Sequence, residues 1–248
     1  MAQDVIEVKN VSKSFGGVKA NVDITMSVKK GSITGIIGPN GCGKSTLFNS
    51  IVGYHPIDTG SIKFEGEEIS HLRVGDIARL GMLRTFQQTR IYTKMDCVDN
   101  MQISVSQRPG SSSTMFASRK GEIRERAEHL LEFVGLYSKR SLISGDLSFG
   151  QQKLLEFAMA LMNEPKVLLL DEPTAGINPT LINGLINRLQ RANEELGITL
   201  CVIEHNMRVI MNLASHIYCL SNGKMLADGK PEKLQNDPRV VDAYLGGH

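Results

Sequence analysis

Apolar and polar residues alternate along the first part of the chain. DVIEVKNVSKSF (4–15) and NVDITMSV (21–28) both have a period of two, which is typical of antiparallel strands with one buried face. GSIKFEGEEI (60–69) continues this pattern around a glycine and predicts a short hairpin. Glycines and polar residues separate these pieces, so the first 85 or so residues are predicted to alternate strand with turn.

Continuous apolar runs predict a second kind of strand. SITGIIG (32–38), KVLLLDE (166–172) and ITLCVIE (198–204) carry almost no polar residue until their ends, as strands buried on both faces do. KSTLFNSIVG (44–53) and PTLINGLINRLQRANEELG (179–197) have apolar residues at helical spacing. Strands that alternate with helices in this way favour an α/β core with a parallel sheet.

The pattern changes between about residues 90 and 146. QRPGSSSTMFASRKG (107–121) has the composition of a loop. EIRERAEHLLEFVGL (122–136) is an amphipathic helix by its periodicity, and QQKLLEFAMALMNEP (151–165) reads as a helix that Pro165 stops. We therefore expect a mostly helical insertion in the α/β core.

The last part of the chain returns to strands and short helices. HIYCLSNGKMLADG (216–229) carries Asn222-Gly223 between two strand-like runs, which is a strong hairpin signal. PEKLQNDPRVVDAYLG (231–246) is predicted to form short helices. The chain shows no internal repeat.

Composition narrows the class of protein. The length of 248 residues suits one large domain or one domain with an inserted subdomain. With 28 Lys and Arg against 26 Asp and Glu, the net charge of +2 is too balanced to favour nucleic acid or an anionic membrane surface. The first residues lack a signal peptide pattern, and no apolar run approaches the roughly 18 residues of a membrane span. We expect any membrane role to be peripheral.

Four cysteines lack the spacing of a disulfide framework or a metal site. They are Cys42, Cys97, Cys201 and Cys219. Reduced, mostly buried thiols in a cytosolic protein are the expectation.

GPNGCGKST (38–46) matches the phosphate-binding loop pattern G-x-x-x-x-G-K-[ST] in full. An apolar strand precedes it and a helix follows it, so the alternative of a chance glycine-rich turn is disfavoured. Backbone N–H groups would face a phosphate, Lys44 would reach the β- and γ-phosphates, and the Ser45 hydroxyl would ligate Mg²⁺. The predicted nucleotide-binding residues of this loop are Gly38, Asn40, Gly41, Cys42, Gly43, Lys44, Ser45 and Thr46.

Cys42 lies inside this loop at a helix N-terminus, which favours thiolate. We expect alkylation of Cys42 to block ATP binding.

Two adjacent acids end the apolar run KVLLLDE. Asp171 at the tip of a strand beside the phosphate loop is placed to hold Mg²⁺. The Glu172 side chain would point in a different direction from that of Asp171. It could polarise a water molecule directed at the γ-phosphate, as a general base does. The alternative is that Glu172 only caps a turn.

LSFGQQK (147–153) places Ser148 and Gly150 at the start of a helix. A small hydroxyl residue and a glycine there form an anion site without a lysine. Taken alone, the segment could equally be an ordinary N-cap. His205 after its strand is likewise more often structural than catalytic when it is considered by itself.

Together these motifs resemble the ATP-binding subunit of ABC transporters over nearly the whole chain. GPNGCGKST resembles the Walker A segment, KVLLLDEP the Walker B segment with its catalytic glutamate, and LSFGQ the family signature. Gln87 is similar to the Q-loop glutamine and His205 to the switch histidine, while residues 175–178 occupy the D-loop position. Phe15 fits the aromatic residue that stacks on adenine. Phe15 apart, these are six motifs, and six in this order are very specific.

The chain departs from the commonest family pattern at a few positions. Phe149 replaces the usual signature glycine, and Asn178 stands where many D-loops carry Asp. Both variants resemble the importers of branched-chain amino acids, whose relatives carry amides or urea. Phe15 in place of Tyr keeps the stacking ring.

The resemblance implies a P-loop NTPase (RecA-like) core with an antiparallel β subdomain and an inserted helical subdomain. It implies one ABC ATPase domain over 1–248, with the core in 1–89 and 163–248 and the helical subdomain in 90–162. ATP and Mg²⁺ would be its cofactors, with Ser45, Gln87 and Asp171 as metal ligands. The catalytic residues would be Glu172, His205 and Gln87.

The resemblance also implies partners. Two ATP-binding subunits, the same or related chains, would pair head to tail, with Ser148, Gly150 and Gln151 completing the site of the other chain. The dimer would drive integral-membrane permease subunits at the cytoplasmic face of the inner membrane, and indirectly serve a solute-binding protein; no nucleic acid is expected.

Three other functions stay open at this point. The chain could serve a lipopolysaccharide-type exporter, whose subunits share the YLG-like ending but more often carry the glycine-rich signature. It could be a non-transport ABC ATPase that acts on a soluble assembly. A P-loop kinase would need an acceptor site and would not need the signature. The transported substrate is not readable from this chain.

Overall fold

The structure is a computed structural model that describes residues 3–85, 91–105 and 116–245. Its contacts divide the chain into two compact units. The first unit contains Met1–Arg84, Lys166–Pro173 and Gln190–His248, and the second contains Thr85–Pro165 and Thr174–Leu189. The subdomain boundaries at residues 89/90 and 162/163 stay a prediction.

An antiparallel sheet forms the first part of unit one, as the alternating pattern predicts. In the described residues its order is β2-β1-β4-β5. The strands are β1 (Asp4–Phe15), β2 (Val18–Lys29), β4 (Thr59–Phe64) and β5 (Glu67–Glu68). Alternate residues of β1 such as Ile6 and Val8 are buried, which confirms that one face of this sheet covers a core.

The second sheet of unit one is almost entirely parallel. Over the described ranges its order is β10-β9-β3-β8-β7-β6, and only β10 runs antiparallel to its neighbour. Its strands are β3 (Ile33–Ile37), β6 (Met82–Arg84), β7 (Val167–Asp171), β8 (Thr199–Ile203), β9 (His216–Ser221) and β10 (Lys224–Gly229). Every residue of β3, β7 and β8 is buried, which confirms the prediction from their apolar runs.

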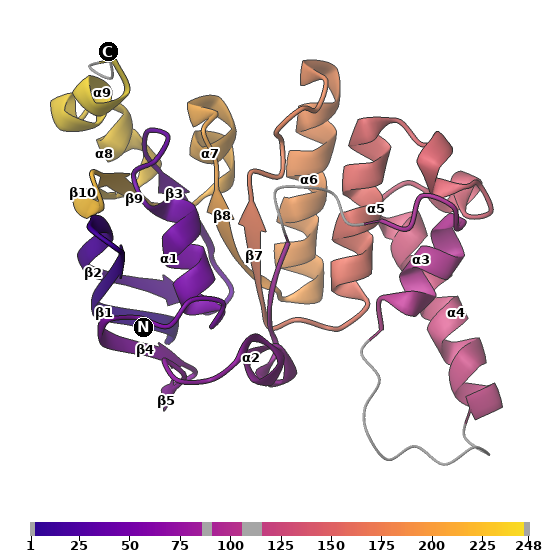
Figure 1. Cartoon of the computed structure of the whole chain (residues 1–248). Coiled ribbons are helices and arrows are strands. Elements are labelled where there is room, and N and C mark those ends of the chain that lie inside the picture. Colours follow the sequence, from indigo (N-terminus) through magenta and orange to yellow (C-terminus); the bar gives the residue numbers. More distant parts are fainter. Residues whose placement is uncertain (1–2, 86–90, 106–115, 246–248) are drawn as a thin grey trace. The chain divides into compact units, whose positions relative to one another are not determined.

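Helix α1 (Lys44–Ile51) is the next element after β3, and the predicted phosphate loop connects the two (Figure 1). One cluster of buried side chains joins the helix with both sheets, and Ile6, Ile36 and Phe48 belong to it. The Tyr218 hydroxyl also accepts from the Ser27 N–H at 3.1 Å and donates to the Ser27 carbonyl at 3.0 Å, which ties β9 to β2. This packing fixes the loop that precedes α1.

The predicted hairpin between β9 and β10 is confirmed. Asn222 and Gly223 have φ values of 49° and 74°, the left-handed pair that a tight two-residue hairpin turn requires. The short helices α8 (Pro231–Gln235) and α9 (Pro238–Leu245) then follow, also as predicted.

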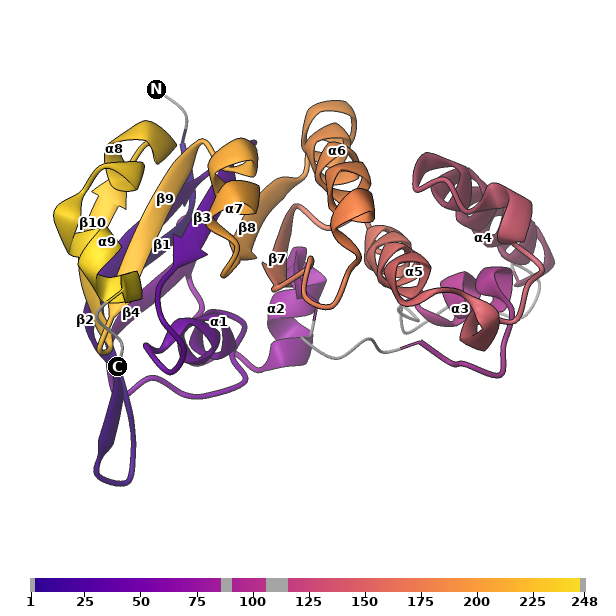
Figure 2. The same ribbon diagram turned by 90° about the horizontal axis from the view of Figure 1, so that it is seen from above.

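Unit two is mostly helical, which confirms the predicted insertion. It contains α3 (Cys97–Ile103), α4 (Phe116–Phe133), α5 (Phe149–Leu161) and the first part of α6 (Pro179–Leu196). Figure 2 shows α3, α4 and α5 gathered together. The buried Asn100 amide supports this unit from inside, because it donates to the Ser144 hydroxyl at 3.1 Å and the Asp96 carbonyl at 2.9 Å.

Three elements differ from the sequence prediction. The loop expected over 107–121 ends earlier, since α4 begins at Phe116; Ala117, Arg119 and Lys120 are good helix formers. Helices α2 (Val74–Leu80) and α7 (Met207–Leu213) were not predicted, because each spans only 7 residues and gives little periodic signal. None of the helices in the described part of the chain is long and apolar enough to cross a membrane.

Candidate nucleotide site

Three neighbouring parallel strands bring the candidate residues of unit one to one edge of the sheet. The phosphate loop follows β3, His205 follows β8, and Asp171 with Glu172 ends β7. Ligands of α/β proteins bind at the carboxyl ends of such strands. The sheet topology therefore places these predicted residues at a single candidate site.

The phosphate loop depends on glycines at its bends. Gly38, Gly41 and Gly43 have φ values of 146°, 76° and 103°, which L-residues with side chains rarely adopt. Gly43 is also the N-cap of α1 and makes no side-chain cap bond. The N-cap side chain therefore satisfies none of the first N–H groups of α1, and a phosphate in the loop would do so.

Lys44 lies folded over its own loop. Its side chain is buried, and Nζ donates to the Gly38 carbonyl at 2.8 Å and the Pro39 carbonyl at 3.0 Å. Ser45 is exposed and Thr46 half-buried, so the residue predicted to ligate Mg²⁺ is accessible. The ammonium is thus held in position by two backbone oxygens of the loop.

Residues from other segments of the chain hold the loop backbone through hydrogen bonds. The Asn21 side-chain amide donates to the Gly43 carbonyl at 3.1 Å, and the Gly223 N–H donates to the Cys42 carbonyl at 3.1 Å. A Cβ on Gly43 would come within 2.2 Å of the Ala20 carbonyl oxygen. Sequence reasoning did not identify Asn21 or Gly223 as part of the site, because contacts between distant segments leave no local pattern.

The expectation of a thiolate at Cys42 is wrong. Burial raises the pKa of the Cys42 thiol above its usual value, and the opposing effect of nearby Lys44 is smaller. Nζ of Lys44 lies 3.7 Å from Sγ, yet Cys42 is only 3% exposed and belongs to the buried cluster of unit one. Desolvation therefore outweighs the helix N-terminus here.

Asp171 ends β7 as a buried carboxylate. Its Oδ2 accepts from Arg84 Nη2 at 2.5 Å, and the two side chains are only 3% and 7% exposed respectively. Oδ1 is buried, and no hydrogen-bond partner for it exists among the described residues. One oxygen of this acid is therefore left for a further ligand, which fits the predicted metal role.

Arg84 is a site residue that the sequence prediction missed. It is the last residue of β6. Its Nη1 donates a hydrogen bond to the Asn49 side chain on α1, and its Nη2 donates one to the Asp171 carboxylate. Its guanidinium also lies over the Phe48 ring, 5.7 Å from the centroid. Arg84 thus joins α1 to the strand that carries the acids.

Glu172 leaves the strand in a different direction from Asp171, as predicted. Its φ of 50° is left-handed, a conformation that costs on the order of 1 kcal/mol for a residue with a side chain. Its Oε1 lies 2.6 Å from Nε2 of His205. The two predicted catalytic residues therefore form a hydrogen-bonded pair at the ends of adjacent strands.

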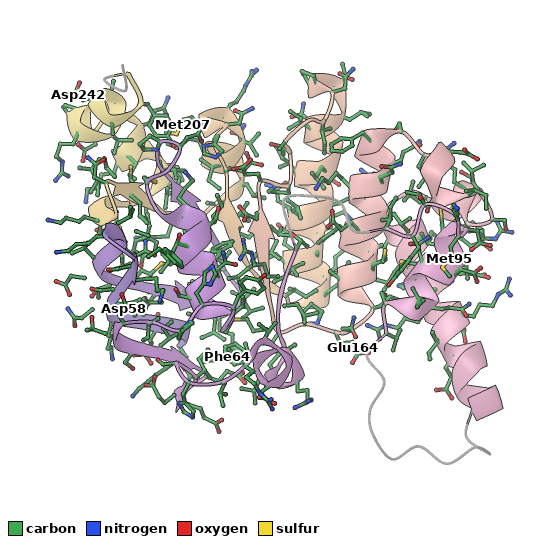
Figure 3. The ribbon with its side chains drawn as sticks, in the orientation of Figure 1. Asp58, Phe64, Met95, Glu164, Met207 and Asp242 are labelled. Atoms are coloured by element: carbon green, nitrogen blue, oxygen red, sulfur yellow. The ribbon has the colours of Figure 1, made fainter. Side chains whose placement is uncertain are left out.

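Phe15 ends β1 with 44% of its surface exposed. The Lys13 ammonium lies 5.2 Å from its ring centroid, and the His55 ring packs edge-on at 5.1 Å. Asp58, labelled in Figure 3, accepts from Lys13 at 3.0 Å and from the Ser14 N–H at 2.6 Å. An exposed ring on a fixed backbone suits stacking with a base.

The signature residues lie in unit two, at the start of α5. Ser148 is the N-cap and forms a capping box with Gln151, since the Ser148 N–H donates to the Gln151 side chain at 3.1 Å. Gly150 is buried in the first turn. The predicted helix start is confirmed, whereas the nucleotide contacts of these residues stay a prediction.

Phe149 packs on the D-loop of the same unit. A Cβ on Gly176 would lie 2.8 Å from Cε1 of Phe149, so the ring occupies the space that the glycine leaves open. The ring is still 45% exposed. The unusual signature residue thus contacts the D-loop directly.

The remaining predicted site residue, Gln87, lies outside the described residues.

Comparisons with known proteins agree with these motifs. A family model described as ABC transporter matches residues 22–175, and one described as branched-chain amino acid ATP-binding cassette transporter matches residues 224–248. A probable branched-chain amino acid transport ATP-binding protein, LivG from Archaeoglobus fulgidus, is 38% identical over 98% of this chain and 95% of its own length. A high-affinity branched-chain amino acid transport ATP-binding protein, BraF from Pseudomonas aeruginosa, is 35% identical over 99% of both chains.

Solved structures give the same result. The ADP conformation of MJ1267, an ATP-binding cassette of an ABC transporter, matches with a TM-score of 0.86 and 35% identity over 98% of this chain and 99% of that one. A dimeric post-hydrolysis state of the ATP-binding cassette MJ0796, bound to ADP and Pi, matches with a TM-score of 0.78 and 25% identity over 91% and 98%.

Proposed function

The chain belongs to the ATP-binding cassette family of ABC transporters, and from this premise we propose that it powers an importer of branched-chain amino acids or related amides. Family membership makes it an ATP-hydrolysing subunit with a nucleotide-binding α/β cassette. The resemblance stated from its motifs is thereby confirmed.

The Glu172–His205 pair is the observation that carries the proposed hydrolysis. With Oε1 and Nε2 only 2.6 Å apart, His205 holds the Glu172 carboxylate in one orientation. A carboxylate fixed in this way can accept a proton from a water directed at the γ-phosphate. The Lys44 ammonium, which the Gly38 carbonyl positions, would contact the phosphates, where its charge stabilises the developing negative charge.

The residues of the site fit a magnesium ion. The free Oδ1 of Asp171 is a hard oxygen donor in a buried position, and the Ser45 hydroxyl is exposed at the start of α1. We assign both to the metal, with Gln87 as the third predicted protein ligand. When bound, the ion would neutralise charge on the β- and γ-phosphates.

We propose that a second ATP-binding subunit completes the site. Ser148, Gly150 and Gln151 begin a helix whose N–H groups suit an anion, and the capping box keeps that helix start ordered. They lack a cation of their own, which suits a phosphate already held by another chain's loop. The dimeric relative bound to ADP and Pi supports such an assembly.

The match over residues 224–248 favours the branched-chain amino acid group within the family. The curated relatives with this substrate in their names cover nearly the whole chain. We therefore propose permease subunits as membrane partners, a solute-binding protein as the source of substrate, and a position at the cytoplasmic face of the inner membrane.

Affinity purification from native membranes in mild detergent, followed by mass spectrometry, tests the importer proposal. Permease subunits are expected to accompany the tagged chain. After reconstitution in liposomes, a leucine-loaded solute-binding protein should stimulate ATP hydrolysis, and the Glu172→Gln complex should not respond. An active preparation that contains only soluble partners would refute the transport role.

A further inference from the structure

The C-terminal helix reaches the phosphate loop. Tyr244 in α9 accepts a hydrogen bond through its hydroxyl oxygen from the Gly38 N–H, at 2.7 Å. Gly38 is the first residue of the loop, so 206 positions of sequence separate the two partners. No motif of the loop or of the resemblance assigns a role to this tyrosine.

Gly38 is tightly enclosed at this point. A Cβ there would come within 2.1 Å of the Leu220 carbonyl oxygen and 2.7 Å of the Cys42 sulfur. Solvent therefore has little access to the Gly38 N–H, which makes the tyrosine hydroxyl its partner in place of water.

The carbonyl of the same residue holds the Lys44 ammonium. The Gly38 carbonyl accepts from Lys44 Nζ at 2.8 Å. A continuous series of contacts thus runs from Tyr244 through both polar groups of Gly38 to the ammonium that meets the phosphates. Movement of Gly38 would displace the carbonyl oxygen that accepts the Lys44 hydrogen bond.

Helix α9 is anchored well enough to act as a support. Val240 is 1% exposed, so it packs α9 against the rest of unit one, where residues of α9 contact β10. Tyr244 follows one turn after Val240, on the same face of the helix. Asp242, labelled in Figure 3, lies in the same helix with an exposed side chain.

We propose that Tyr244 is a positioning residue for nucleotide binding: its hydroxyl fixes Gly38 and thereby the place of Lys44 in the phosphate loop. The segment matched over residues 224–248 then has a role at the nucleotide site of its own chain. This inference rests on the proposed function of the loop.

Tyr244→Phe in the full chain separates the hydroxyl from the ring. We expect the Kd for a fluorescent ATP analogue with Mg²⁺ to rise roughly 3- to 10-fold, because a buried N–H loses its partner. In the assembled transporter KM for ATP should rise by a similar factor, with kcat nearly unchanged. Asp242→Asn is the matched control and should leave both values within twofold of wild type.

Hydrogen–deuterium exchange provides a second measurement that needs no nucleotide. The peptide that contains Gly38 should exchange faster in Tyr244→Phe than in wild type or Asp242→Asn, while peptides of the β1–β2 hairpin exchange equally. Unchanged Kd together with unchanged exchange at Gly38 would overturn the inference. A wild-type chain that binds no nucleotide would instead refute the proposed function, so the two failures are distinguishable.

Discussion

The phosphate loop and the signature helix start are two proposed anion sites that are built in different ways. The loop in unit one has a buried lysine, a network of bracing contacts and acids on neighbouring strands. The start of α5 in unit two has a capping box between Ser148 and Gln151, and the exposed Phe149 ring lies 5.8 Å from the Lys153 ammonium. We propose that the first binds the nucleotide of its own chain, whereas the second contributes to a nucleotide held by another chain. Substitutions in the two regions should therefore affect different steps.

The largest effect is expected at Glu172. Glu172→Gln keeps the size of the side chain and removes the proton acceptor, so kcat for ATP hydrolysis should fall by about 100-fold or more. Nucleotide affinity should stay close to wild type, because Lys44 and the loop are untouched. Steady-state hydrolysis and equilibrium ATP binding, measured on the same preparation, check this result; a loss of less than tenfold would remove Glu172 from its assigned role.

The largest effect on the free energy of unfolding among these substitutions is expected at Arg84. Arg84→Met leaves the buried Asp171 carboxylate without its cation, which should cost about 3 kcal/mol in urea unfolding of the isolated chain. Bound Mg²⁺ and nucleotide should reduce that loss by supplying positive charge.

Arg79→Met is the control for Arg84, since Arg79 pairs with Asp76 on the surface and its side chain is 73% exposed. It should unfold at the same urea concentration as wild type. Equal behaviour of the two variants would show that the Arg84–Asp171 pair is not important for stability.

A substitution at Phe149 tests the role of the signature helix start in unit two. Phe149→Ala removes the ring that packs on Gly176, so the D-loop loses a contact. We expect ATP hydrolysis by the assembled transporter to fall several-fold, while nucleotide binding to the isolated chain stays unchanged. Weaker binding by the isolated chain would mean that the two regions are not functionally separate.

The smallest effect concerns Cys42. Because burial raises the pKa of its thiol, the thiolate fraction at neutral pH is below that of a free cysteine, and alkylation should be slow. The rate should increase as the pH rises towards the raised pKa. Rates of iodoacetamide labelling at Cys42, followed by mass spectrometry between pH 7 and 9, check this sign; labelling at pH 7 as fast as that of free cysteine would contradict it.

Local patterns predicted most of the elements and the candidate residues of the site, but not the contacts that hold those residues in place. The loop 38–46, the acids and the helix start at Ser148 each lie within one short segment, so spacing alone identifies them. Arg84, Asn21 and Tyr244 act through partners far away in the chain, and only the fold reveals them. The thiolate prediction failed for the same reason: burial is a property of the packed loop.

Ser148→Asp tests the central claim that the signature completes the nucleotide site of another chain. Aspartate is as good an N-cap as serine, so the fold of unit two should persist, while its charge would repel a phosphate at the start of α5. We predict near-complete loss of ATP hydrolysis in the assembled transporter, with nucleotide affinity of the isolated chain within twofold of wild type. Full hydrolysis by Ser148→Asp would contradict the account.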